Sequence, residues 1–243
     1  MYQEAINNYL KQHGHEKINL KAVLFDMDGV LFNSMPNHAS SWHKVMERMG
    51  FGLSEEEAYM HEGRTGADTI NIISRRERGC DATDEEIKAI YAAKSEEFNK
   101  CPEAPRMPGA WEVLNKIKDD GLTRMIVTGS GQVSLLDRLN KNFPGIFQKE
   151  LMVTAFDIKF GKPNPDPYLM ALEKGGLKPN EAIVIENAPL GVQAGVAAGI
   201  FTIAVNTGPL PDEVLWDAGA NLLFHCMPEF NENWETVRNT LIG

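Results

Sequence analysis

The sequence predicts an α/β protein with a Rossmann-like parallel sheet as its core and an inserted all-helical cap domain. Two observations lead to this fold class. Unbroken apolar runs such as 22–25 alternate with helical patterns, which is typical of buried parallel strands joined by right-handed crossovers. Within 36–105, by contrast, only helical patterns occur. We therefore expect an α/β core from 1–34 and 106–243 and a helical cap from 35–105.

The N-terminal segment, residues 1–17, is expected to be a helical appendage packed on the core. Residues 2–13 read as a short amphipathic helix, and Ile6, Tyr9 and Leu10 form its apolar side. No chemistry is assigned to this helix. The first buried strand of the core follows it.

That first strand, 20–26, ends on acidic residues and leads into the cap. Apolar residues at helical spacing begin after Pro36, which fits the first turn of a helix. Ser54 fits the N-cap of a second helix with an acidic first turn. Two longer helical patterns follow, at Asp68–Arg78 and Asp84–Asn99. A proline-rich linker then leads back to the core.

From Gly109 onward the sequence returns to alternating helices and strands. We expect helices at Trp111–Asp119, Ser134–Phe143, Asp166–Gly175 and Gly191–Gly199. We expect strands at Thr123–Thr128, Leu151–Thr154, Ala182–Glu186, Phe201–Val205 and Asn221–Phe224. Strands alternating with helices predict that the sheet is parallel.

Composition limits the partners and the location of the chain. The formal charge of −10 and the lack of a basic stripe argue against nucleic acid. The N-terminus does not resemble a signal peptide, and no apolar run is long enough to span a membrane. Cys80, Cys101 and Cys226 lack metal-ligand spacing and indicate reduced side chains. We expect a cytoplasmic monomer without nucleic-acid or membrane partners.

Four groups of polar residues lie after strands or in loops at one edge of the predicted sheet. Asp26 and Asp28 end the first strand, residues 128–130 end the second, Lys162 lies in a loop before a helix, and residues 186–187 end a later strand. In open α/β sheets, ligands bind beyond the carboxyl ends of the strands. Each group alone could be an ordinary turn or a solvated side chain. The ordered set indicates a single site.

The motifs resemble those of a known family. Phe-Asp-Met-Asp-Gly-Val, Val-Thr-Gly-Ser, Gly-Lys-Pro-Asn-Pro and Val-Ile-Glu-Asn-Ala-Pro-Leu-Gly, with a helical insert in the position of a cap, are similar to the haloacid dehalogenase (HAD) superfamily. The resemblance extends over nearly the whole chain from about residue 20, and it points to the branch that contains β-phosphoglucomutase and small phosphatases. It implies a Mg²⁺ cofactor and a small phosphorylated substrate.

The resemblance also implies roles for three charged residues. Asp26 would be the nucleophile that forms an aspartyl-phosphate. Asp28 would be the general acid for the leaving group and then the general base for water. Lys162 would offset the negative charge of Asp26 and the phosphate.

Phosphate and metal binding are implied for a further set of residues. Thr128 would hold the transferring phosphoryl group, and the backbone N–H groups around Gly129 and Ser130 could cradle its oxygens. Magnesium prefers oxygen ligands and retains bound water. Its ligands, direct or through water, would be Asp26, the backbone carbonyl of Asp28, Glu186 and Asn187.

Asn187 departs from the commoner pattern of the family, in which an Asp follows the Glu. An amide oxygen can bind Mg²⁺ but brings no charge, so another carboxylate could substitute. Glu62, in the cap loop Glu-Gly-Arg-Thr-Gly, is the candidate, and we expect it to reach the metal when the cap closes. The alternative is a solvated loop acid paired with Arg64.

Three further residues are candidates for substrate binding and positioning. His38 lies ten residues after Asp28, in register with a His that helps to position the second acid in relatives. Lys94 is the counterpart of a cap Lys that shares this role. Arg64 lies in the same cap loop as Glu62. Trp42 is expected to pack in the cap.

These features favour a Mg²⁺-dependent phosphohydrolase. Because Glu62 and Asn187 are similar to the residues of a HAD-family inorganic pyrophosphatase, we expect pyrophosphate as the first substrate and sugar phosphates as the second. The alternative is a β-phosphoglucomutase-type sugar-phosphate mutase, which shares the core but must grip a distal phosphate. An alternative of another class is a non-catalytic phosphate-binding regulator. Dehalogenation is disfavoured, because the dehalogenases of the superfamily work without metal.

Overall fold

A six-stranded parallel sheet forms the centre of the computed structural model, which describes residues 2–130 and 135–243. The strand order is β3-β2-β1-β4-β5-β6. The strands are β1 (Ala22–Phe25), β2 (Thr123–Val127), β3 (Met152–Val153), β4 (Ala182–Glu186), β5 (Phe201–Val205) and β6 (Leu222–Phe224). All neighbouring pairs are parallel. The predicted α/β fold is confirmed.

β1 lies inside the sheet and is buried on both faces. Leu24 pairs with Met125 of β2 on one side and with Val184 of β4 on the other. Successive side chains of a strand point to opposite faces, so Ala22 and Leu24 join one apolar cluster, and the residues between and after them join the other. This double burial explains why the strand is apolar without alternation.

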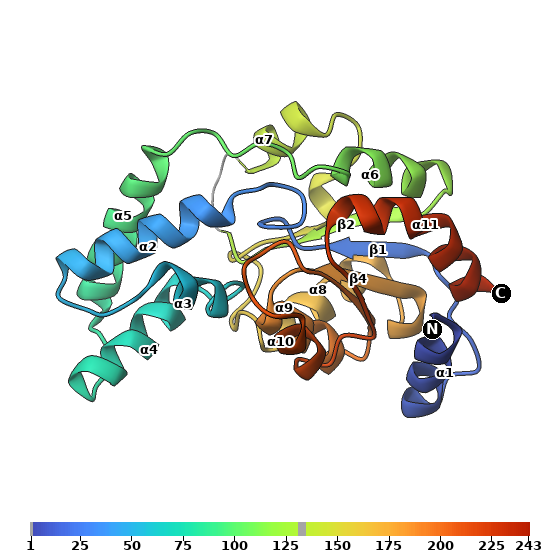
Figure 1. The fold of residues 1–243 in the computed structure, drawn as a ribbon, viewed down its shortest axis with the longest axis horizontal. Coiled ribbons are helices and arrows are strands. Elements are labelled where there is room, and N and C mark those ends of the chain that lie inside the picture. Colours follow the sequence, from blue (N-terminus) through green and yellow to red (C-terminus); the bar gives the residue numbers. More distant parts are fainter. Residues whose placement is uncertain (1, 131–134) are drawn as a thin grey trace.

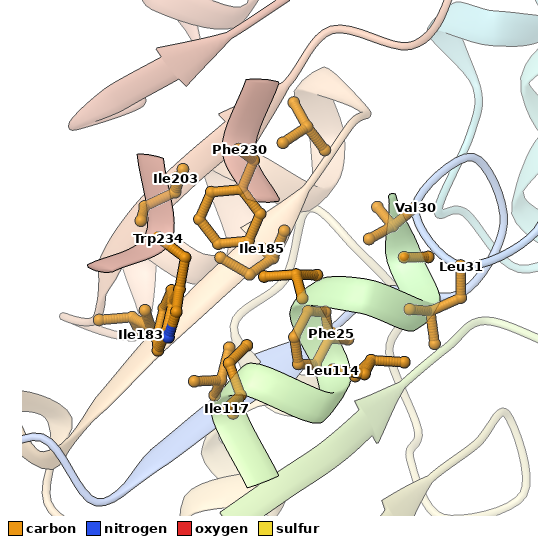
Figure 2. Close-up of a cluster of buried hydrophobic side chains, with 14 of the residues drawn as sticks. Phe25, Val30, Leu31, Leu114, Ile117, Ile183, Ile185, Ile203, Phe230 and Trp234 are labelled. Carbon is orange, nitrogen blue, oxygen red and sulfur yellow. The ribbon is translucent and has the colours of Figure 1, made fainter. Parts of the chain in front are cut away.

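Helices cover both faces of the sheet (Figure 1). One face carries α6 (Ala110–Asp119), α7 (Leu135–Asn142) and α11 (Met227–Ile242). The other carries α8 (Asp166–Gly175), α9 (Pro189–Ala197) and α10 (Asp212–Asp217). Figure 2 shows the first cluster, where residues of β1, β4 and β5 meet side chains of two helices: Leu114, Ile117, Phe230 and Trp234. Burial of each such side chain contributes about 1.5–3 kcal/mol.

The N-terminal helix α1 (Tyr2–His13) packs on the core at the end opposite the cap helices (Figure 1). Ile6 and Tyr9 are buried in the same apolar cluster as α11. The Tyr9 hydroxyl donates a hydrogen bond to the carbonyl of Gly199 at 2.9 Å. The expected surface-packed helix is therefore present, with two of its three apolar residues fully in the core.

The remaining helices gather at one end of the molecule (Figure 1). They are α2 (Met35–Arg48), α3 (Glu55–Met60), α4 (Gly66–Arg78) and α5 (Asp84–Asn99). They share an apolar cluster of their own, centred on Val45, Met46, Ile70, Ile73 and Ile90. A separate cluster supports our proposal that residues 35–105 form a cap domain.

Two adjacent segments join these helices to the core. The backbone N–H of Asn33 donates to the carbonyl of Pro105 at 3.0 Å, and that of Met107 donates to Leu31 at 2.8 Å. Phe32 and Arg106 form an antiparallel bridge. The two connections are thus hydrogen-bonded to each other.

Several elements differ from the sequence-based expectations. α9 begins at Pro189, two residues before the expected start, because proline suits the first turn of a helix. α4 begins at Gly66, since the Thr65 side chain caps the helix. The helices α10 and α11 were not predicted at all. Ser134, the expected start of α7, lies outside the described residues. Within residues 2–130 and 135–243, no helix is long and apolar enough to cross a membrane.

Candidate active site

The predicted site residues meet where β1, β2 and β4 end and the cap loop begins. A cavity of about 100 Å³ lies between the core and the cap. Its lining includes ten of the residues singled out from the sequence: Asp26, Asp28, His38, Trp42, Glu62, Arg64, Lys94, Thr128, Gly129 and Ser130. Lys162 and Asn187 are not part of the lining but bond to two of its members, Asp26 and Glu62. Glu186 lies behind them and bonds to Lys162.

Lys162 holds Asp26 in place. Its ammonium group donates hydrogen bonds to Asp26 Oδ1 at 2.6 Å, to the carbonyl of Val127 at 3.0 Å and to Glu186 Oε1 at 2.5 Å. The side chain is 1% exposed, so these contacts are not screened by water. Burial raises the pKa of Asp26, and the positive charge of Lys162 opposes that rise.

Glu186 is fully buried and accepts hydrogen bonds on both carboxylate oxygens. Oε1 accepts from Lys162 and from the Tyr168 hydroxyl at 2.9 Å. Oε2 accepts from the backbone N–H groups of Asn187 at 3.0 Å and Ala188 at 3.2 Å. The structure therefore places Glu186 against Lys162.

Asp28 is held by the first turns of helix α2. Ser34 Oγ donates a hydrogen bond to Asp28 Oδ1, and His38 Nε2 lies 3.4 Å from the same oxygen. Burial alone would raise the pKa of Asp28, but His38 and Ser34 outweigh it, so the pKa lies below the usual range. Lys94 Nζ lies 2.7 Å from His38 Nδ1. Because an ammonium group only donates hydrogen bonds, this ring nitrogen is the acceptor.

The cap loop places Glu62 against Asn187. Asn187 Nδ2 donates a hydrogen bond to Glu62 Oε1 at 2.9 Å. Burial, followed by the charge of Asp26, raises the pKa of Glu62 well above its usual range. Among the described residues no ion pair joins Glu62 to Arg64, and the Nε of Arg64 is buried without a hydrogen-bond partner. The alternative of a solvated Glu62–Arg64 pair is not what the structure shows.

Two polar turns complete the site. The hydroxyl of the buried Thr128 accepts a hydrogen bond from the backbone N–H of Ser130 at 3.1 Å. Gly29 turns the chain away from Asp28 with φ +82°, and a Cβ there would lie 2.0 Å from Asn187 Nδ2. Only glycine fits this position, both for its conformation and for the space left by Asn187.

The donor set fits a divalent cation. The buried Oδ1 of Asn187 has no hydrogen-bond partner, and Asp26, Asp28, Glu62 and Glu186 gather more negative charge than Lys162 offsets. No three His, Cys, Asp or Glu side chains of the described chain form a metal-type cluster. A cation here would therefore need amide, backbone carbonyl and water oxygens as well, which is the coordination that Mg²⁺ accepts.

Sequence reasoning missed three residues that contact the site. Ser34 bonds to Asp28, Tyr168 bonds to Glu186, and the Thr207 hydroxyl donates to the carbonyl of Gly29 at 2.6 Å. Ser34 could have been noticed, because it directly precedes the predicted start of helix α2. Tyr168 lies on the apolar side of α8, and the sequence pattern there predicts a buried side chain without predicting its hydrogen bond.

The fold and the site together define an α/β protein in which Asp26, Asp28 and the buried Lys162 meet at one edge of a parallel sheet. Comparison with known proteins agrees. The family described as "Haloacid dehalogenase-like hydrolase" matches residues 23–205. Hexitol phosphatase A of Escherichia coli (strain K12) is 34% identical over 188 residues, covering 76% of this chain and 83% of that protein.

A solved structure and a further relative agree as well. A structure from Bacteroides vulgatus described as "Putative beta-phosphoglucomutase" has a TM-score of 0.97 and 79% identity, covering 99% of this chain and 98% of that one. A phosphatase of phosphorylated carbohydrates from Thermotoga maritima is 29% identical over 203 residues, covering 83% of this chain and 92% of that protein.

The chain belongs to the haloacid dehalogenase-like hydrolases. The resemblance predicted from the motifs is confirmed. The protein is therefore an enzyme of the HAD phosphatase or phosphoglucomutase-like kind, and the alternative of a non-catalytic regulator is set aside.

Proposed function

We propose that the enzyme is a Mg²⁺-dependent phosphohydrolase that acts through an aspartyl-phosphate, with inorganic pyrophosphate as its first substrate. The proposal rests chiefly on one observation: Glu62 of the cap reaches into the site and shares a hydrogen bond with Asn187. A cap carboxylate in this position narrows the site on the side where the leaving group must lie. It therefore favours a compact leaving group such as phosphate.

In the first half of the reaction, an oxygen of Asp26 attacks phosphorus. The bond between phosphorus and the leaving oxygen breaks, and the protonated form of Asp28 supplies the proton that this oxygen needs. Because His38 and Ser34 lower the pKa of Asp28, this form is the minor one in the free enzyme. Lys162 offsets the negative charge on the transferring group. Its hydrogen bond to Asp26 places the positive charge of Lys162 beside the carboxylate that attacks.

In the second half, water attacks phosphorus and the bond to Asp26 breaks. Asp28 accepts the proton of the water, and phosphate leaves. His38 and Ser34 keep the Asp28 carboxylate oriented between the two halves.

The residues that would hold magnesium are Asp26, the backbone carbonyl of Asp28, Asn187 and Glu62. When bound, the cation would supply positive charge next to the transferring phosphoryl group. The free Oδ1 of Asn187 is the observation that supports this assignment. A metal ion would also relieve the repulsion between Glu62 and Asp26 that the raised pKa of Glu62 reflects.

The size of the cavity supports a small substrate. Pockets for drug-sized ligands measure about 300–1,000 Å³, and this one measures about 100 Å³. Aromatic side chains, including Trp42, Tyr91 and Phe98, close its cap side. A hexose phosphate would require the cap to open further than a pyrophosphate would.

Hydrolysis of a small sugar phosphate is the second candidate. Its support is the names of relatives: one acts on hexitol phosphate and another on phosphorylated carbohydrates. A sugar-phosphate mutase is the third, supported by the description of the Bacteroides vulgatus structure. A mutase must bind a sugar bisphosphate, which is larger than pyrophosphate, and the cavity of about 100 Å³ disfavours it.

A panel of substrates tests the ranking. Phosphate release is measured with Mg²⁺ on pyrophosphate, hexitol and hexose phosphates, and a phosphonate control, with Asp26→Asn as the inactive reference. A coupled assay follows conversion of β-glucose 1-phosphate to glucose 6-phosphate. We expect the highest kcat/KM on pyrophosphate. A higher value on a sugar phosphate would make the second candidate correct, and isomerisation faster than phosphate release would make the third correct.

A further inference from the structure

Tyr168 is a buried polar residue that the reaction scheme above does not use. It lies on α8, on the far side of Lys162 from the cavity, and its side chain is fully buried. Its hydroxyl donates a hydrogen bond to Glu186 Oε1 at 2.9 Å. Its ring lies against the ammonium group of Lys162, 5.2 Å from the ring centroid. The residue thus contacts both members of the pair behind the nucleophile.

We propose that Tyr168 is a positioning residue for phosphoryl transfer, acting through Glu186 on Lys162. The inference rests on the proposed aspartyl-phosphate chemistry but not on the identity of the leaving group. Tyr168 does not line the cavity, and its hydroxyl bonds to Glu186. The effect of the hydroxyl must therefore pass through the carboxylate that it fixes.

Glu186 is shaped as an anchor for Lys162. An ionised carboxylate offers about four lone-pair directions, and here four donors fill them: Lys162, Tyr168 and the backbone N–H groups of Asn187 and Ala188. No direction is left for direct contact with a cation. We therefore place Glu186 behind the lysine and give it no direct metal contact.

Helix α9 closes the anchor from another side. A Cβ on Gly191 would lie 1.8 Å from Glu186 Oε1, so the helix backbone already occupies the space into which the carboxylate could turn. Tyr168 is the one side-chain donor, other than Lys162 itself, that contacts this carboxylate in the described chain. Its hydroxyl therefore decides whether Oε1 stays aimed at Lys162.

The position of Lys162 matters because its partner changes during the reaction. Before transfer, Lys162 donates to the Asp26 carboxylate. Once Asp26 carries a phosphoryl group, the negative charge that Lys162 faces lies on the phosphoryl oxygens and no longer on the Asp26 carboxylate. Fixed contacts with Glu186 and the carbonyl of Val127 keep the ammonium group in reach of those oxygens, so that it need not swing to a new partner.

The test compares Tyr168→Phe with a matched control, Tyr9→Phe. Both variants remove one hydroxyl from a buried tyrosine that makes one hydrogen bond at 2.9 Å, but Tyr9 bonds to Gly199, on the N-terminal side of the core. We expect the unfolding midpoint to fall in both variants, and to fall further in Tyr168→Phe, because a hydrogen bond to a charged group contributes more than one to a carbonyl. We expect kcat to fall about tenfold in Tyr168→Phe alone, as for loss of one hydrogen bond to a charged group. KM should stay within about twofold.

A double-mutant cycle shows whether the effect passes through Glu186. In the Glu186→Gln background, Tyr168→Phe should lower kcat by less than about twofold, because Tyr168 no longer has a carboxylate to orient. Two results would overturn the inference. One is a kcat of Tyr168→Phe equal to that of Tyr9→Phe. The other is a full tenfold loss in the Glu186→Gln background.

The choice of substrate keeps this test separate from the proposed function. The ratio of wild-type to variant kcat is measured on pyrophosphate and on acetyl phosphate, which would form the same aspartyl-phosphate. If pyrophosphate is not hydrolysed but acetyl phosphate is, the pyrophosphatase proposal fails while the ratio still decides the role of Tyr168. A ratio near one on acetyl phosphate contradicts the positioning role whatever the natural substrate is.

Discussion

Glu62 and Asn187 join the cap to the core through one hydrogen bond between an acid and an amide. The site has an amide at Asn187, where the pattern implied by the resemblance has an acid. We propose that Glu62 of the cap supplies the charge that the amide lacks, so metal affinity should depend on cap closure. Replacement of Asn187 by a second carboxylate would place two acids in contact and remove the donor that Glu62 now uses.

Glu62→Ala should raise the Mg²⁺ concentration that gives half-maximal activity, by about tenfold, as for other residues that support a metal site. The measurement is phosphate release at a series of Mg²⁺ concentrations. Glu77→Ala is the matched control, because Glu77 is a cap acid that pairs with Arg76 on the surface. An unchanged Mg²⁺ dependence in Glu62→Ala would show that this residue does not serve the metal.

Lys94 gives a stability prediction with a defined pH dependence. Burial lowers the pKa of Lys94 from 10.5 to about 8, although Asp28 partly opposes the shift. Below about pH 8 the folded chain carries a buried charge at a cost in stability. Between about pH 8 and 10.5 the unfolded chain binds more protons than the folded chain, so stability from this group rises with pH.

Lys94→Met removes the ammonium group and should remove the rise in stability with pH. At pH 7 the buried charge costs the wild type up to about 3 kcal/mol, since one pKa unit corresponds to about 1.36 kcal/mol. Between about pH 7 and 10, the free energy of unfolding of the wild type should therefore rise by up to that amount relative to that of the variant. Denaturant titrations at both pH values measure it. A difference that stays constant would contradict the lowered pKa.

At the residue scale, Asp26 and Asp28 could be predicted because acids interrupt an apolar run where a strand ends. The resemblance added Lys162 in a loop and His38 and Lys94 on helices. Ser34 lies six residues from its partner Asp28 and could have been noticed. Tyr168 bonds to a residue on another element, so the local pattern carries no sign of that contact.

Among the elements, strands and capped helices were predicted well because their signals are local. Helices α5 and α8 begin and end where expected, since capping residues or proline mark their starts. Helix α11 was missed, although Phe230, Trp234, Val237 and Leu241 recur on one face and are buried. The helical spacing of its apolar residues is present in the sequence, but it lies after the last strand that we expected, where no further element was assigned.

The cap loop meets the core through backbone contacts that only small residues permit. A Cβ on Gly161 would lie 2.8 Å from Thr65 Cγ2 and 3.1 Å from the Thr65 backbone nitrogen. A Cβ on Gly129 would lie 3.3 Å from the carbonyl of Gly63. The loop therefore sits close to the phosphate-binding turn when the cap is closed.

Gly161→Ala should hold the cap partly open. Thr65 caps helix α4, so it cannot move without shifting the whole helix. We expect kcat/KM to fall at least tenfold, because a small displacement of the cap removes Glu62 from the site. Steady-state kinetics measure the effect, and the unfolding midpoint shows whether the core is intact.

A cap glycine that meets no backbone supplies the control for this change. A Cβ on Gly52 would come no closer than 3.5 Å to any atom, and that atom belongs to the Glu77 side chain. Gly52→Ala should leave kcat/KM unchanged. Equal kinetics for the two variants would show that the Gly161 contact does not govern closure.

Over the whole molecule, the charge of −10 would repel the anionic substrate that we propose. Lys162, Arg64, backbone N–H groups and the proposed cation would offset the carboxylates of the site and attract that substrate locally. The alternation of strands and helices was enough to predict the parallel sheet. The sequence also predicted that Glu62 of the cap reaches the site near Asn187. The close approach of Thr65 to Gly161 was not predictable, because these two residues lie far apart in the sequence.

The N-terminal helix α1 allows stability and activity to be separated in one molecule. It lies at the end of the core opposite the cap (Figure 1), and Tyr9 packs edge-on against Phe201 of β5 at 5.4 Å between ring centroids. Deletion of residues 2–13 removes two buried side chains and exposes the core beneath them. The free energy of unfolding should fall by about 4 kcal/mol or more, which corresponds to about 8–16 °C in Tm for a chain of this size.

The same deletion should leave kcat unchanged when it is measured well below the lowered Tm, because no residue of α1 contacts the site. Ile6→Ala combined with Tyr9→Ala in the full chain is the matched variant, and it should reproduce most of the loss in Tm. Calorimetry and phosphate release measure the two quantities on the same samples. A fall in kcat without a fall in Tm would contradict this prediction. It would mean that the helix acts on the active site across the sheet and does more than stabilise the core.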